Sequence, residues 1–267
     1  LYSERMRRTS FAPGKLILSG DYAVLFGYAG IAVPSSAGIQ VVFEEDKACE
    51  GVEIVWEGAS EVWLEYARKI VALCAQRANI RGRLFIHCDL PLGKGMGSST
   101  ALVIGIVRAL LGEDAREPAL FIEDILNPGH SGLDFSVIWG NVPTLFRKGV
   151  APETIELPEE SLSGAMLIDT GVPSEPTAEL VAWMRSRELE IQEPLKMIGS
   201  CTERLLCGEP LAPVMREHSR AQAALGVVPP KVQELIAAIE GIGGAAKVIG
   251  AGGRTGGPLQ SCRPATA

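Results

Sequence analysis

The chain has 267 residues, of which 47% are hydrophobic and 21% are charged, a composition typical of a folded globular protein with one large domain or two ordinary ones. Its 32 acidic and 25 basic side chains give a formal net charge of −7. That balance argues against general nucleic-acid binding, which needs a basic face, but it leaves room for a local basic pocket that binds an anionic ligand.

The cysteines and the N-terminus bear on compartment and on metal binding. The six cysteines are scattered without a C-x-x-C pattern, and only three histidines are present, so a zinc site is not predicted. The cysteines indicate free thiols in a reducing compartment. No apolar run is long enough to cross a membrane, and the first ten residues lack the apolar core of a signal peptide. We therefore expect a cytoplasmic protein without membrane attachment, as a monomer or homodimer.

The first half of the chain alternates short apolar runs with turns. Ala12-Pro13-Gly14 is typical of a turn, and Lys15 opens a short apolar strand that follows it. A helix is predicted from Glu61 to Ala78, because its apolar residues recur at helical spacing. Further strands are predicted at 31–33, 39–43, 52–56 and 83–90.

A glycine-rich stretch joins the strand at 83–90 to an apolar helix that starts near Ala101 and ends near Leu111. It contains Gly93, Gly95 and Gly97 at every second position, followed by the hydroxyl residues Ser98, Ser99 and Thr100. Such a turn at a helix start offers backbone N–H groups and the positive end of the helix dipole to a phosphate. The spacing fits neither G-x-x-x-x-G-K-[ST] nor G-x-G-x-x-G, and a plain tight turn is the alternative.

The rest of the chain predicts mixed elements, in an order that is not a repeating βαβ pattern. A short helix is expected at 119–126, and Asp134 then stands between two apolar residues. A carboxylate in that position needs a partner or a chemical role; a helix cap or a structural salt bridge is the alternative. Helices are expected from 175 and at 188–207, 210–225 and 230–240, with strands at 165–171 and from 245 into a second glycine-rich turn.

Three separated stretches together resemble the motifs of the GHMP kinases, and they span almost the whole chain. The first motif is Ala12-Pro-Gly-Lys-Leu-Ile-Leu-Ser-Gly-Asp-Tyr-Ala-Val24, the second is Pro91-Leu-Gly-Lys-Gly-Met-Gly-Ser-Ser-Thr100, and the third is Lys247-Val-Ile-Gly-Ala-Gly-Gly253. Ser131-Gly-Leu-Asp134 and Asp169-Thr-Gly171 are most similar to segments of the mevalonate kinases within that family.

The resemblance implies an ATP-dependent kinase that phosphorylates a small alcohol, with mevalonate favoured. It implies that Asp134 and Lys15 are catalytic and that Ser99 and Glu123 bind Mg²⁺. The triphosphate of ATP would lie on Gly93, Gly95, Gly97, Ser98, Ser99 and Thr100. The substrate pocket would contain Asp21, Tyr22, Thr170, Gly250, Ala251 and Gly252. Neither nucleic acid nor membrane is expected as a partner.

Some positions depart from the mevalonate kinase pattern and keep alternatives open. Asp21-Tyr22 replaces the usual Glu-His, and the family's phosphomevalonate kinases often have Tyr there. Arg254 interrupts the last glycine run, and the segment between the second motif and Asp134 is short. Phosphomevalonate kinase or another GHMP kinase is therefore the alternative enzyme, and a non-catalytic ligand-binding protein on the same fold is a further alternative.

The fold class that the resemblance implies is α+β with two domains. Residues 1–155 would form a mixed α/β domain that carries the glycine-rich stretch, and residues 156–267 would form a ferredoxin-like domain. The active site would lie in the cleft between them.

Overall fold

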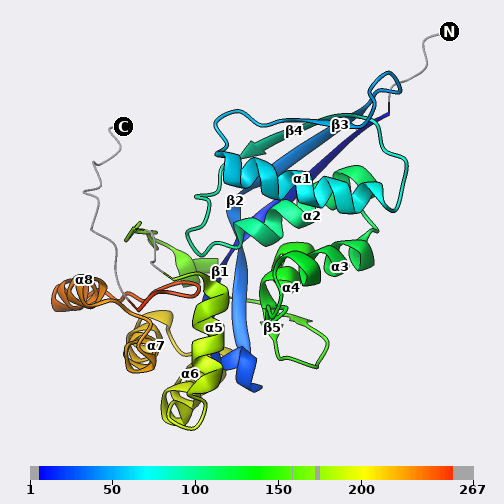
Figure 1. Ribbon diagram of the computed structural model, residues 1–267. Helices are drawn as coiled ribbons and strands as arrows, with labels where there is room; N and C mark the ends of the chain where they lie inside the picture. The colour runs from blue at the N-terminus through cyan, green and yellow to red at the C-terminus, as the bar shows by residue number, and fades with distance from the viewer. Residues whose placement is uncertain (1–5, 158, 172–174, 255–267) are drawn as a thin grey trace.

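The computed structural model describes residues 6–157, 159–171 and 175–254 (Figure 1). A six-stranded sheet is flanked by helices α1 to α4, and helices α5 to α8 gather beside the lower end of its two longest strands. The strands are β1 (Arg7–Ser19), β2 (Gly30–Glu45), β3 (Val52–Val55), β4 (Gly82–Cys88), β5 (Thr144–Phe146) and β6 (Glu153–Thr154).

Strand β2 organises the sheet because it pairs with three other strands. It lies antiparallel to β1 along its length, to β4 through residues 39–45, and to β5 through residues 30–32. β3 extends the sheet beyond β4 as a parallel pair, and β6 extends it beyond β5. The order is therefore β3-β4-β2-β5-β6, with β1 on the other side of β2.

The turn predicted at Ala12-Pro13-Gly14 is wrong, because β1 runs through it without a break. The pairing register with β2 shifts between Pro13, which faces Gly38, and Lys15, which faces Pro34, so residues 35–37 of β2 bulge opposite Gly14. A side chain at Gly14 would lie 2.5 Å from the Leu90 side chain, which explains why a residue without Cβ stands there. Such a bulge increases the local twist of the strand pair, and Lys15 follows it directly.

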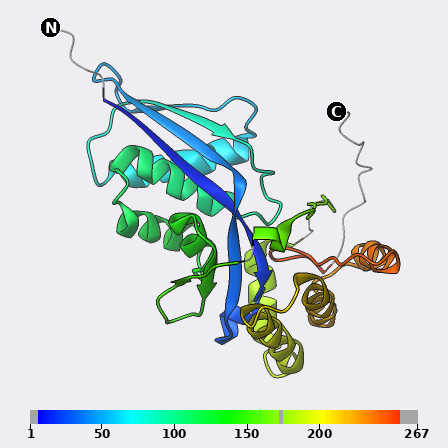
Figure 2. The same cartoon turned by 180° about the vertical axis from the view of Figure 1, so that it is seen from behind.

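Four helices cover one face of the sheet: α1 (Glu61–Ala75), α2 (Ser98–Leu111), α3 (Arg116–Leu126) and α4 (Leu133–Gly140). α2 is buried on nearly all sides, including Leu102, Ile104 and Ile106 at 0% exposure. Figure 2 brings the strands to the front of these helices, and Phe11 of β1 is 44% exposed on the face opposite them. The main hydrophobic core therefore lies between the sheet and α2.

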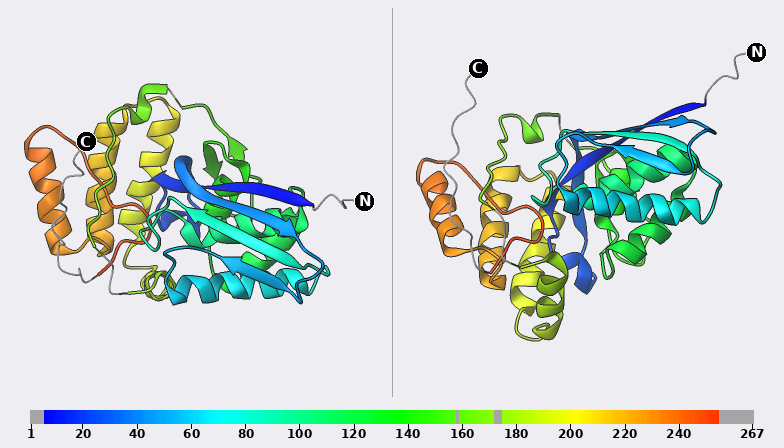
Figure 3. Two further views of the ribbon diagram at one scale, coloured as in Figure 1. Left: turned by 90° about the horizontal axis from the view of Figure 1, so that it is seen from above. Right: turned by 45° about the horizontal axis from the view of Figure 1, so that its top comes forward.

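All the regular elements described after β6 are helices: η2 (Glu159–Leu162), α5 (Thr177–Ser186), α6 (Gln192–Leu206), α7 (Leu211–Leu225) and α8 (Pro230–Gly241). Figure 3 shows them as a group beside the sheet. The helices predicted from sequence are confirmed there, with small shifts of their ends. A second hydrophobic cluster joins α5, α6 and α7 to Tyr22 and Ala23, which stand just after β1.

The strands predicted at 165–171 and from residue 245 are wrong for the residues that the structure describes. Both segments lack strand pairing, and Met166 is 84% exposed. A strand exists only with a neighbour that completes its hydrogen bonds, and no such neighbour lies among the described residues of this half. Residues 255–257 of the predicted strand and turn lie outside the described residues. The α+β class is confirmed, whereas the ferredoxin-like layer and the domain boundary at residue 155 stay predictions.

Two other sequence expectations concern cysteines and membrane spans. The five cysteines in the described part of the chain are free thiols; Cys74 and Cys201 are buried, whereas Cys207 is exposed. None of the helices in the described ranges combines the length and apolar character that crossing a membrane requires.

Helix α1 offers a matched test of the core. Ile70 is 0% exposed in the main core, whereas Val62 on the same helix is 77% exposed. We expect Ile70→Ala to lower the free energy of unfolding by about 2–5 kcal/mol, because it leaves a cavity. Val62→Ala should change it by no more than about 0.5 kcal/mol. Urea unfolding of both variants measures the difference, and equal losses would contradict the placement of the core.

Candidate active site

Lys15 is a buried cation that faces the glycine loop, by which we mean residues Gly93–Gly97. Its side chain is 3% exposed, and its Nζ donates a hydrogen bond of 2.8 Å to the carbonyl oxygen of Gly95. Its backbone N–H also donates to the carbonyl oxygen of Met96, at 2.9 Å. Both the backbone and the side chain of Lys15 are thus attached to the glycine loop.

The glycine loop has a conformation that only glycine adopts readily. Gly93, Gly95 and Gly97 have φ angles of 72°, 80° and 74°. Gly97 caps the N-terminus of α2, and the Ser98 hydroxyl accepts a hydrogen bond of 3.0 Å from the N–H of Gly93, which closes the loop. The loop therefore presents backbone to a ligand at the positive end of α2, as a phosphate site requires.

Asp134 is the acidic residue whose carboxylate lies next to the ammonium group of Lys15. Gly132, with φ of 95°, caps the N-terminus of α4, so Asp134 lies in the first helical turn, where a negative charge is favoured. Its Oδ2 is 3.4 Å from Lys15 Nζ, and its side chain is 36% exposed. Lys15 is thus buried behind a carboxylate that remains open to solvent. The predicted convergence of these two residues beside the glycine loop is present.

Glu123 lies deeper, between α2 and α3. It is 1% exposed, and its Oε1 accepts a hydrogen bond of 2.7 Å from the hydroxyl of Thr100. Its Oε2 has no hydrogen-bond partner among the described residues. Burial raises the pKa of Glu123 above its usual value, although hydrogen bonds from Thr100 and Asn127 oppose that shift. A buried carboxylate oxygen without a partner fits a site that receives a cation.

Two residues that the sequence analysis missed surround this carboxylate. They are Asn127 and Tyr66, and the Asn127 side-chain amide donates a hydrogen bond of 2.9 Å to the Tyr66 hydroxyl. Burial, followed by the charge of Glu123, raises the pKa of Tyr66, while hydrogen bonds from Asn127 and Ser99 lower it. Tyr66 therefore connects α1 to Ser99 and Glu123 as a neutral phenol. No local pattern marked it, since Tyr66 also fits the apolar face of a helix.

The third motif packs directly against the glycine loop. A Cβ on Gly95 would lie 2.9 Å from the carbonyl oxygen of Ile249, and one on Gly250 would lie 3.0 Å from the Cα of Gly95. Residues 250–251 of this motif form a turn, and the Tyr22 hydroxyl donates a hydrogen bond of 2.5 Å to the carbonyl oxygen of Ala251 there. Gly250 thus reaches the glycine loop by close backbone contact, whereas Gly252 packs against the carbonyl oxygen of Val227.

Asp21 does not lie where a substrate ligand would. Its side chain is 1% exposed, and its Oδ2 is 2.8 Å from Lys247 Nζ, whose side chain is 3% exposed. Tyr22, its neighbour, is also buried, at 6% exposure. A carboxylate buried in this way needs an opposite charge, and Lys247 supplies it. The sequence assigned Lys247 no role, although a lone charge among apolar neighbours was a signal.

The segment with Thr170 approaches the glycine loop through a different residue. Lys94 Nζ is 3.0 Å from Asp169 Oδ1. That oxygen also accepts a hydrogen bond of 2.9 Å from the N–H of Gly171. These contacts, first the Gly171 N–H and then Lys94, lower the pKa of Asp169. Thr170 follows Asp169 and is half-buried. The structure thus brings residues 169–171 to the loop without the strand that was expected there.

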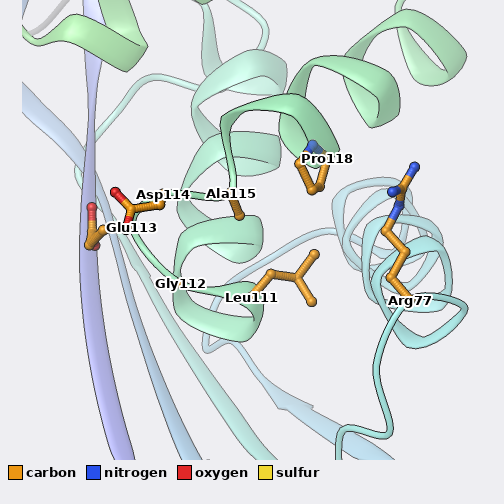
Figure 4. Close-up of a pocket in the computed structure, with 7 residues that line it drawn as sticks. All are labelled: Arg77, Leu111, Gly112, Glu113, Asp114, Ala115 and Pro118. Atoms are coloured by element: carbon orange, nitrogen blue, oxygen red, sulfur yellow. The ribbon is translucent and has the colours of Figure 1, made fainter.

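A surface pocket elsewhere does not belong to this site. It has a volume of about 440 Å³ and lies between the ends of α1 and α2 and the start of α3, lined in part by Arg77, Leu111 and Pro118 (Figure 4). α2 begins at Ser98 beside the glycine loop and ends at Leu111, roughly 20 Å away at the usual rise per residue. None of the predicted site residues lines this pocket.

Comparison with known proteins gives this geometry a family. The family described as GHMP kinases N terminal domain matches residues 65–116. A mevalonate kinase of Thermococcus gammatolerans is 30% identical over 97% of this chain and 90% of its own length. The chain belongs to the GHMP kinases. The family that the sequence analysis recognised is thereby confirmed.

Solved structures support the same fold for this GHMP kinase. A mevalonate kinase of Methanococcus jannaschii superimposes with a TM-score of 0.75 at 19% identity, covering 94% of this chain and 89% of the other. One from methicillin-resistant Staphylococcus aureus MRSA252 is 28% identical, with a TM-score of 0.66, covering 93% of this chain and 87% of the other. Kinases of this family use ATP.

The contact between the glycine loop and the third motif can be tested with two glycines. Gly95→Ala and Gly93→Ala both place a side chain at positive φ, but only the Gly95 Cβ meets another segment, since nothing lies within 4 Å of the Gly93 Cβ. Each should lose about 1–2 kcal/mol of unfolding free energy to backbone strain. Gly95→Ala should lose about 1–3 kcal/mol more to overpacking. Urea unfolding measures both, and equal losses would contradict the contact.

His218, near Asp21, predicts a pH effect on stability. It is 0% exposed; burial, and then the charge of Lys247, lower its pKa well below the usual value, so it is neutral when folded. The unfolded chain binds a proton at this histidine below about pH 6.5, which favours unfolding at low pH. Its stabilising effect is therefore complete above that pH and is lost as pH falls below it.

His218→Gln keeps an acceptor for the N–H of Gly20, which lies 3.3 Å from His218 Nε2, but cannot titrate. Between about pH 7.5 and 5.5, the wild type should lose more unfolding free energy than this variant, by up to about 1.4 kcal/mol per pH unit below 6.5. Chemical unfolding at several pH values measures the difference. Parallel profiles for the two proteins would show that His218 takes up no proton on unfolding.

Proposed function

We propose that this GHMP kinase transfers the γ-phosphoryl group of ATP to the primary hydroxyl of mevalonate. The observation that carries the proposal is the Lys15–Asp134 pair, with 3.4 Å between Nζ and Oδ2, beside a glycine loop at the start of a helix. The curated relative from Thermococcus gammatolerans, named mevalonate kinase, supports the choice of alcohol. Cytoplasmic location and a monomeric or homodimeric state remain predictions.

The chemistry requires positioning and neutralisation of charge more than covalent help. A bond forms between the alcohol oxygen and the γ-phosphorus, the bond from that phosphorus to the β-phosphate oxygen breaks, and ADP leaves. Asp134 accepts or orients the proton of the hydroxyl, for which its partly exposed carboxylate is suited. Lys15 lies beside that carboxylate and offsets negative charge on the transferred phosphoryl group.

The glycine loop would hold the triphosphate through backbone N–H groups of Gly93, Gly95 and Gly97 and through Ser98, Ser99 and Thr100. Of these, the Ser98 and Thr100 hydroxyls already bind Gly93 and Glu123 within the protein. Ser99 also interacts with Tyr66, but it is only half-buried at the helix start, whereas Ser98 and Thr100 are buried, so the Ser99 hydroxyl is the best placed to face the ligand. Lys94 adds a further positive charge to the loop.

A magnesium ion fits the oxygen donors at this position. Glu123 offers its unpartnered Oε2, and Ser99 offers a hydroxyl near the same helix start. No group of three His, Cys, Asp or Glu side chains that could hold a metal occurs in the described part of the chain. Mg²⁺ suits such a site, because it takes few protein ligands and completes its shell with water and phosphate oxygens. Bound there, it would neutralise charge on the phosphates.

The pocket for the alcohol would lie beside Asp134, between the glycine loop and the third motif, with Tyr22, Thr170 and residues Gly250 to Gly252 around it. Tyr22 also favours a second candidate, because the family's phosphomevalonate kinases often have Tyr at this position. Its hydroxyl already donates to Ala251, so it shapes the pocket more than it binds the substrate. Phosphomevalonate is therefore the alternative acceptor.

An assay of ADP release decides between these substrates. We expect turnover with mevalonate in the presence of Mg-ATP, and none with homoserine or galactose. Turnover with phosphomevalonate alone would move the assignment to the second candidate. If folded protein with Mg-ATP turned over none of the four, the non-catalytic alternative would replace the enzyme.

Asp134→Asn tests the catalytic carboxylate. It removes the negative charge and the proton acceptor but keeps the shape, so kcat should fall by about 10²–10⁴-fold. Nucleotide affinity should change by less than about threefold, since phosphate contacts are made by the loop. Asp114→Asn is the matched control, because Asp114 is an exposed acid beyond the far end of α2. An Asp134→Asn variant with full activity would remove Asp134 from this role.

A further inference from the structure

The cluster of Asp21, Lys247 and His218 is buried behind the site and has no part in the mechanism above. Asp21 and His218 are at most 2% exposed, and the Lys247 side chain is 3% exposed. Lys247 begins the third motif, whereas Asp21 follows β1 and His218 lies on α7. The cluster thus joins three parts of the chain that are remote in sequence.

Lys247 cannot bind a ligand in this arrangement. Its ammonium group has three N–H donors, and three acceptors take them: Asp21 Oδ2 at 2.8 Å, the carbonyl oxygen of Val248 at 2.9 Å and that of Ile17 at 3.0 Å. No donor remains for a phosphate or a carboxylate of a substrate. A lysine near a phosphate loop would otherwise be expected to contact phosphate, and here its hydrogen bonds are already complete.

His218 does not share the charge of this pair. Its Nε2 accepts the N–H of Gly20 at 3.3 Å, which requires that nitrogen to be unprotonated. Asp21 Oδ2 lies 3.5 Å from the same nitrogen, beyond a normal hydrogen bond. One positive and one negative charge, those of Lys247 and Asp21, therefore remain in the cluster and neutralise each other.

The backbone at Tyr22 directs adjacent side chains to the same segment. Tyr22 has a φ of 60°, a conformation that costs a non-glycine residue free energy and persists only where the surroundings hold it. Asp21 binds Lys247, and Tyr22 donates to the carbonyl oxygen of Ala251. Asp21 and Tyr22 thus bind the two ends of residues 247–251. Ile249 and Gly250 lie between those ends and contact Gly95.

We propose that Asp21 and Lys247 are positioning residues that hold the third motif against the glycine loop, so that the turn at Gly250 stands in register with Lys15 and Asp134. Neither residue touches ATP or the alcohol. The ion pair fixes the start of the turn, Tyr22 fixes its end, and a displacement of about 1 Å in such a supporting segment is enough to cost about 10²-fold in rate. This proposal deepens the proposed function and rests on it for its kinetic part.

The test uses the double variant Asp21→Asn with Lys247→Met, which removes both charges together and leaves neither buried without a partner. The matched control is Arg83→Met with Glu53→Gln, which removes an exposed ion pair of 3.1 Å between β4 and β3. Thermal unfolding first confirms that both double variants are folded. Asp21→Glu, which keeps the charge, is the conservative variant.

Hydrogen exchange of the nucleotide-free protein gives the first readout, and it does not depend on any substrate. We expect amides of residues 247–253 to exchange at least about tenfold faster in the Asp21/Lys247 double variant than in the wild type, while those of α2 remain unchanged. The Arg83/Glu53 control should leave both segments unchanged. Equal exchange at 247–253 in variant and wild type would overturn the proposal.

Kinetics give the second readout. The double variant should lose about 10–100-fold in kcat, with nucleotide affinity within about threefold of the wild type, and Asp21→Glu should recover part of the loss relative to Asp21→Asn. Unchanged kcat, or a loss explained by a smaller folded fraction with faster exchange everywhere, would reduce the pair to a purely structural role. If the wild type has no kinase activity, the proposed function fails, but hydrogen exchange at residues 247–253 still tests whether the pair holds the third motif.

Discussion

The site depends on the burial of one positive charge. Lys15 has a side chain that is 3% exposed, and it is tolerated there because the Gly95 carbonyl oxygen and the Asp134 carboxylate both face its ammonium group. Lys15 directly follows the point in β1 where residues 35–37 of β2 bulge out of the pairing. An ammonium held in this way cannot move far, so the glycine loop and the N-terminus of α4 are both fixed with respect to one point.

The carboxylates of the site differ in environment, and the difference suits different tasks. Asp134 is partly exposed and lies at a helix N-terminus beside a lysine. Glu123 is buried beside a threonine hydroxyl, and burial raises its pKa. Asp21 is buried further away and is neutralised by Lys247. Of these three carboxylates, Asp134 alone is accessible to a substrate, as proton transfer requires.

The sequence predicted the parts of the site that are encoded locally. Three glycines at alternate positions before two serines and an apolar helix specify the loop, and its φ angles follow from that pattern. Asp134 stood out as a charge in an apolar setting, and its partner Lys15 was found through the family motifs. Helix positions were also well predicted, because helical periodicity is a property of short segments.

The sequence could not predict the contacts that depend on the whole fold. Asp21 pairs with a lysine 226 positions away, and nothing in the first motif indicates that its acid is turned inward. The strands expected at 165–171 and from residue 245 failed for a related reason. Apolar alternation specifies a strand only when another strand is there to pair with it, and pairing is decided by remote segments.

The second hydrophobic cluster has a consequence for how the molecule folds. Ala23, which is 0% exposed, packs with residues such as Leu180 and Leu195, so the apolar surface of α5 and α6 is closed by residues from the first motif. A chain cut at residue 155 would expose that surface on one fragment and leave Tyr22 and Ala23 uncovered on the other. Because each stretch covers apolar surface of the other, we expect the two to unfold together.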